Sequence, residues 1–185
     1  MRTRLDTSAG LLSIVDSVNR WSDPSGVDSL VAASLNNIVS ALLEQQDDTL
    51  ADPDVSTAMI LGADAARTLW YRAGTWLNHE RADCLCALVF NRLGDHAKAL
   101  EAAERGQRVI ERSGCEDVDR AFLMLESVRA LIGLSRKAEA TERLRRATAM
   151  ATKWDDEETK QWFDRTAQPI RDLVDQRVHA NPEAT

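Results

Sequence analysis

Apolar residues recur at helical spacing along most of the chain, and no stretch alternates apolar and polar residues over the length of a strand. A first helix is expected to carry Leu11, Leu12, Val15 and Val18. Two more are expected at residues 27–46 and 55–78, separated by an acidic linker that contains turn-forming residues. The pattern predicts an all-α fold.

The second expected helix is unusual because residues 29–43 contain no charged side chain. Its large apolar residues include Leu30, Val31, Leu35, Ile38 and Leu42. A helix buried on most of its circumference would account for this composition. The alternative is a self-association or partner surface, since an apolar patch on a soluble protein usually has a use. A homodimer is therefore one possible state of the protein.

Residues 80–112 read as a complete pair of antiparallel helices. Leu93-Gly94-Asp95-His96 forms the turn, where glycine takes backbone angles that other residues avoid. Small residues, where the helices would cross, and one large aromatic flank it: Ala87, Phe90, Ala99, Ala103 and Gly106. A second segment, residues 117–152, repeats part of this spacing about 41 residues later, with Leu134-Ser135 at its turn.

This spacing resembles the tetratricopeptide repeat, a helix-turn-helix unit of about 34 residues that stacks into a superhelix. Asp83 stands where the family has an aromatic, Glu111 replaces its closing proline and Val128 replaces a small crossing residue, so both units are divergent. The resemblance implies a right-handed superhelix of antiparallel helix pairs with about seven to eight helices. One domain over residues 1–180 is expected, with divergent helices at 6–79 and a short tail at 181–185.

A closing helix is expected at residues 154–178, because a repeat stack needs its last apolar face covered. Its apolar stripe comprises Trp162, Phe163, Ala167, Ile170, Leu173 and Val174. Pro169 is expected to kink this helix or to divide it.

In tetratricopeptide stacks the first helix of each unit lines a concave groove. The resemblance places seven residues there: Arg81, Leu88, Asn91, Arg92, Phe122, Leu125 and Arg129. Arginine forks and an amide would suit a peptide carboxylate or an acidic side chain. The alternative is that these arginines pair with acidic neighbours within the chain.

The net charge of −7 lies unevenly along the 185 residues. Residues 1–64 hold three arginines and ten acidic residues, whereas the remainder is balanced. Nucleic-acid binding is not expected, because it needs an excess of basic residues. No apolar run approaches the roughly 20 residues of a membrane span, and no signal peptide is evident, so a cytoplasmic protein is expected.

No catalytic motif, phosphate loop or metal-ligand spacing is present, and His79, Asp83, Cys84 and Cys86 fit no zinc pattern. We therefore expect no enzyme, no cofactor and no metal. The leading hypothesis is a protein-interaction module that binds a peptide or helix in its groove. One alternative is a chaperone resembling class II chaperones of bacterial type III secretion. Another is a regulatory domain that binds a small ligand between helices near Trp70 and Trp76.

Overall fold

The computed structural model describes residue 15, residues 27–114 and residues 117–179, and its regular elements there are all helices. The all-α prediction is confirmed for this part of the chain. The helices are α2 (Val27–Leu43), α3 (Asp47–Leu50), α4 (Pro53–Ala73), α5 (Trp76–Arg92), α6 (His96–Ser113), α7 (Asp117–Gly133), α8 (Lys137–Ala151) and α9 (Glu157–His179). Most of the helix expected before Val27 lies outside the described residues, but its Val15 is buried in the core.

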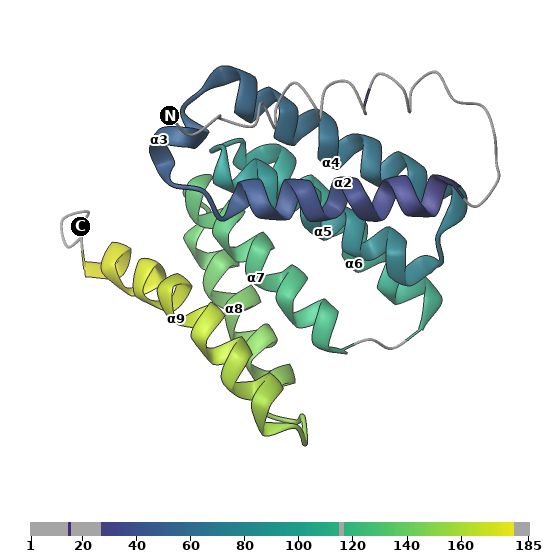
Figure 1. Cartoon of the computed structure of the whole chain (residues 1–185). Coiled ribbons are helices and arrows are strands. Elements are labelled where there is room, and N and C mark those ends of the chain that lie inside the picture. The colour runs from purple at the N-terminus through teal and green to yellow at the C-terminus, as the bar shows by residue number, and fades with distance from the viewer. Residues whose placement is uncertain (1–14, 16–26, 115–116, 180–185) are drawn as a thin grey trace.

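The helices pack as consecutive pairs, α2 with α4, α5 with α6 and α7 with α8. Figure 1 shows α2 and α4 side by side at one end of the molecule and α9 at the other. The helices α2, α5, α7 and α9 also form a row, because α5 packs on both α2 and α7, and α7 packs on α9. The right-handed superhelix stays a prediction.

The two helix pairs in the middle of the chain keep one register. The second pair begins 41 residues after the first at both of its helices, Trp76 against Asp117 and His96 against Lys137. Their turns make the same backbone hydrogen bonds. The amide of Gly94 donates to the Asn91 carbonyl at 3.2 Å, and the amide of Ser135 donates to the Ile132 carbonyl at 3.0 Å.

Positive φ angles occur at the same place in both turns, 79° at Gly94 and 61° at Ser135. The second turn therefore adopts the geometry of the first without the glycine that usually permits it. The expected interval of about 41 residues is found at the starts of the helices and in the turns.

The helix expected at residues 55–78 is divided at Gly74, one of two interior glycines, with Gly62, at which the sequence left a break or close helix packing open. The first part, α4, ends at Ala73, and the second, α5, begins at Trp76. Asn78 causes the new start, because its Oδ1 accepts a hydrogen bond from the Thr75 amide at 2.9 Å and so caps α5. Trp76 and Leu77 thus belong to the helix pair that was expected to begin at residue 80.

Asp83 is a buried acidic residue at the contact of three helices. The carboxylate is fully buried, and it accepts hydrogen bonds from Tyr71 Oη at 2.7 Å and Arg105 Nε at 3.1 Å. These contacts join α4, α5 and α6. A buried carboxylate with both partners present is compatible with a stable core.

Two clusters of buried apolar residues form the core, the first under α2 to α6 and the second under α6 to α9. Phe90 packs against both clusters and so connects them. In α9 the buried stripe is Phe163, Ala167, Ile170 and Val174, and the helix continues through Pro169 rather than dividing there. Within the described residues, no helix has the length and apolar character that crossing a bilayer requires.

Candidate functional site

A groove opens along the row α2, α5, α7 and α9. It consists of two adjoining cavities, of about 460 and 340 Å³, which share Leu88 and Glu126 in their linings. We call the smaller one the Trp162 cavity and the larger one the Arg129 cavity. The Trp162 cavity is lined by Asn36, Ser40, Glu80, Arg81, Cys84, Leu85, Leu88, Asp119, Phe122, Glu126, Trp162 and Thr166. The Arg129 cavity is lined by Leu43, Leu88, Asn91, Arg92, His96, Glu126, Arg129, Ile132, Gly133 and Leu173.

Helical spacing gives each of the four helices one face toward the groove. On α2 the lining residues are Asn36, Ser40 and Leu43, and on α9 they are Trp162, Thr166 and Leu173. Such positions lie on one side of a helix because about 3.6 residues complete a turn. α5 and α7 supply most of the remaining surface. The groove is therefore a product of the packing of these four helices and not of any loop.

Six of the seven residues predicted for the groove line these cavities: Arg81, Leu88, Asn91, Arg92, Phe122 and Arg129. The prediction for Leu125 is wrong. Its side chain is fully buried in the second core cluster, so it contributes nothing to an open surface.

The three arginines of this set are engaged within the chain. Arg81 Nε donates to Asp119 at 3.0 Å, Arg92 reaches Asp47 at 2.6 Å, and Arg129 lies 3.3 Å from the carboxylate of Glu126. This is the alternative that the sequence left open. A carboxylate ligand would compete with these partners for the guanidinium groups.

Glu126 sits at the junction of the two cavities. Only 6% of its side chain is exposed, and burial raises the pKa of its carboxyl above the ordinary value, while Arg129 and Asn91 act in the opposite direction. Asn91 Nδ2 donates to Glu126 Oε2 at 3.0 Å, and Asn91 Oδ1 lies 3.4 Å from His96 Nδ1. The floor of the groove is thus a connected polar network inside an apolar surround.

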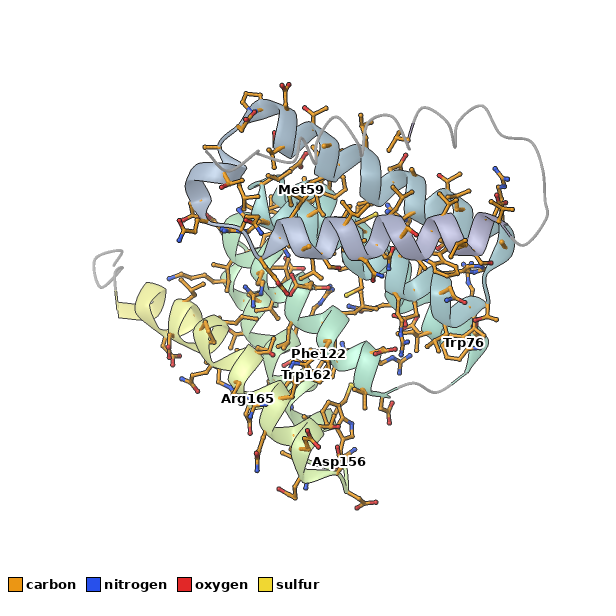
Figure 2. The ribbon with its side chains drawn as sticks, viewed as in Figure 1. Met59, Trp76, Phe122, Asp156, Trp162 and Arg165 are labelled. Atoms are coloured by element: carbon orange, nitrogen blue, oxygen red, sulfur yellow. The ribbon has the colours of Figure 1, made fainter. Side chains whose placement is uncertain are left out.

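The closing helix supplies a groove wall that the sequence did not predict. Figure 2 shows Trp162 of α9 beside Phe122 of α7, and their ring centroids are 4.2 Å apart. Trp162 is 52% exposed and Leu173 is 43% exposed, so both lie at the edge of the stripe that was expected to be buried. Trp162, Thr166 and Leu173 follow one another at intervals of four and seven residues, which places them on one face of α9 beside the buried stripe, and this spacing was the available signal.

The residues proposed for self-association are divided by the packing of α2. Leu35 and Leu42 are buried in the first core cluster, so for them the prediction of a contact surface is wrong. Leu30 is 69% exposed, while Val31 and Ile38 are half-buried. None of the five lines either cavity.

The other candidate chemistry is structural. Trp70 and Trp76 are half-buried against the first core cluster and line neither cavity. Burial, followed by the nearby carboxylates, raises the pKa of the Cys84 thiol well above its usual range, and burial raises that of Cys86 to about 12. Among the residues with described positions, no group of three histidine, cysteine or acidic side chains is arranged to hold a metal ion.

Comparisons with models of known protein families, with curated proteins and with solved structures find no match for this chain.

Proposed function

We propose that this chain is a protein-interaction module that binds a peptide or a helix of a partner in the groove between α2, α5, α7 and α9. The observation that carries the proposal is the gathering of large exposed apolar side chains at one place. Leu88, Trp162 and Leu173 are 37%, 52% and 43% exposed, come from two helices and line the same groove. Exposed apolar surface with a polar rim is typical of contact sites.

The helix pairs of this module would be divergent tetratricopeptide units that form a right-handed superhelix. The shared register of the two central pairs and the matching backbone of their turns support this proposal. A row of first helices along a groove is the arrangement by which such stacks bind extended ligands.

The titratable groups of the groove support binding without catalysis. Burial and three carboxylates raise the pKa of the Cys84 thiol, so the thiol stays protonated and is a poor nucleophile. The carboxylate of Glu126 is held by Asn91 and Arg129. These partners fix the position of the Glu126 side chain. A protonated thiol and a fixed carboxylate are suited to recognising a ligand.

Leu88 offers the sharpest test, because it lines both cavities. The chain would be used as bait in a native lysate as the unchanged protein, as Leu88→Asp and as the control Leu134→Asp. Leu134 follows α7, is 36% exposed against 37% for Leu88, and lines neither cavity. We expect a partner that the unchanged protein and the control retain and that Leu88→Asp loses. A partner retained equally by all three proteins would show that the groove is not the binding site.

A further inference from the structure

The Trp162 cavity has an excess of acidic groups. Three carboxylates, those of Glu80, Asp119 and Glu126, face one guanidinium, that of Arg81, among the described residues of its lining. Arg81 is held by two of them, at 3.0 Å from Asp119 and 3.5 Å from Glu80. The third carboxylate, that of Glu126, lies 3.3 Å from Arg129 of the adjoining cavity, so among the described residues three carboxylates meet two guanidinium groups.

The three carboxylates act on the Cys84 thiol in the same direction. After burial, the influences that raise the pKa of Cys84 are the charges of Glu126, Glu80 and Asp119, in that order. Negative charges stabilise the protonated thiol, so all three act at the sulfur despite the neighbouring arginine. A cavity with partly buried walls concentrates such a field toward its opening.

The walls of the cavity suit the extended methylene stem of a lysine or arginine side chain. The indole of Trp162 is 52% exposed and leans on the ring of Phe122, with 34° between the two planes. Aromatic faces attract lysine and arginine, and the methylene stems of these residues pack on apolar surface such as Leu88. The buried Oδ1 of Asn36, in the α2 wall, accepts no hydrogen bond from any described residue.

We propose that the Trp162 cavity binds a lysine or arginine side chain of a partner protein, while Leu88 contacts an apolar side chain of the same segment. This proposal rests on the proposed function, since it specifies what the groove recognises. The occupant is an amphipathic segment with a basic residue on its apolar face. Charge complementarity favours a basic anchor over an acidic one. An acidic anchor would lie near three carboxylates in the Trp162 cavity, and in the Arg129 cavity it would meet arginines that already pair with carboxylates.

A peptide-display selection tests this proposal. Random 16-residue peptides are selected on the full chain and screened again on Leu88→Asp and on Leu134→Asp, so that groove-dependent binders are identified first. We expect lysine or arginine to be enriched at one position of those binders. Trp162→Ala should weaken their Kd about 3- to 30-fold, the range of a partly desolvated cation–aromatic contact. Asp119→Asn should also weaken it, and added salt should weaken it further. Circular dichroism of each variant shows whether it remains folded.

The outcomes separate the two proposals. The proposal of a basic anchor is wrong if the groove-dependent binders show no preferred basic residue, or if Trp162→Ala and Asp119→Asn leave their affinities unchanged. Either result would leave the proposed binding function intact. Replacement of that lysine or arginine by glutamine in the peptide should reproduce the loss, and the Trp162→Ala chain should distinguish the two peptides less than the unchanged chain does. Binders that ignore Leu88→Asp, or no binders at all, would overturn both proposals.

Discussion

Replacing Phe163 by alanine should detach α9 from the rest of the molecule. The ring is fully buried and lies edge-on to two other aromatics, with centroids 5.6 Å from Trp154 and 5.7 Å from Phe122. A buried aromatic ring removes about 200 Å² from water, which at about 25 cal/mol per Å² is worth about 5 kcal/mol. Phenylalanine-to-alanine changes in protein cores cost about 3–5 kcal/mol, so we expect a loss of about 4 kcal/mol.

This loss should fall on one helix because of where α9 lies. Its main contacts are with α7 and α8, and Ala167, Ile170 and Val174 are its other buried apolar residues in the described part. Phe163 therefore supplies a large share of the contact that holds α9. Units at the end of a chain open at a lower free energy than the whole fold, so α9 should open while α4, α5 and α6 stay protected.

Hydrogen exchange resolved by segment, together with urea unfolding, measures both quantities. Trp162→Ala is the matched control, since Trp162 is the adjacent aromatic but is half exposed, and its removal should cost about 1 kcal/mol or a little more. The reasoning is refuted if Phe163→Ala costs less than about 1 kcal/mol. It is also refuted if protection falls equally in α4 and in α9.

Four further substitutions test other features. Gly94→Ala should destabilise the protein by about 1–2 kcal/mol because φ is 79° there. Ser135→Gly should stabilise it by up to about 1 kcal/mol, because glycine adopts the positive φ at this position without strain. Urea unfolding measures both changes, and changes of the same sign and size in the free energy of unfolding would contradict the argument. Burial raises the pKa of Glu126, so its contribution to stability is present below its ordinary pKa and lost as the pH rises through the raised value. The stability of Glu126→Gln relative to the unchanged protein should therefore increase from acid to neutral pH, and a difference independent of pH would show that the carboxyl is not perturbed. Gly133→Ala would place a Cβ 2.1 Å from Cδ2 of His96, so the imidazole should turn away from Asn91; an unchanged His96 resonance in NMR spectra would disprove this contact.

The helices and their register were predictable because they depend on short-range patterns. Apolar spacing and the turn at Gly94 locate a helix pair, and the second pair follows from the same spacing. The apolar pattern does not change at the start of α5, which depends on the capping contact between Thr75 and Asn78, so Gly74 was the signal for a break there.

The groove was predictable only in part, because its properties depend on contacts between distant residues. Arg81 and Asp119 are 38 positions apart, and Arg92 meets Asp47 across the linker after α2. No pattern in the sequence indicates such pairs. Leu125 and Glu126 lie three and four positions after Phe122, so both belong near the groove face. The packing of the second core cluster decides that the leucine is buried and the glutamate lines the cavities.

The matched turns at Gly94 and Ser135 are two points at which the backbone has the same geometry, and we call them joints. At both, the residue after the positive φ donates its amide back across the turn, Asp95 to the Phe90 carbonyl and Arg136 to the Leu131 carbonyl, each at 2.9 Å. The stretch between the joints holds one complete outer helix and one complete groove helix. A tandem copy of residues 95–135, inserted after Ser135, would extend the molecule by a hairpin whose ends already have the backbone geometry of their new neighbours. The length of the groove is thus a property that one gene duplication can change.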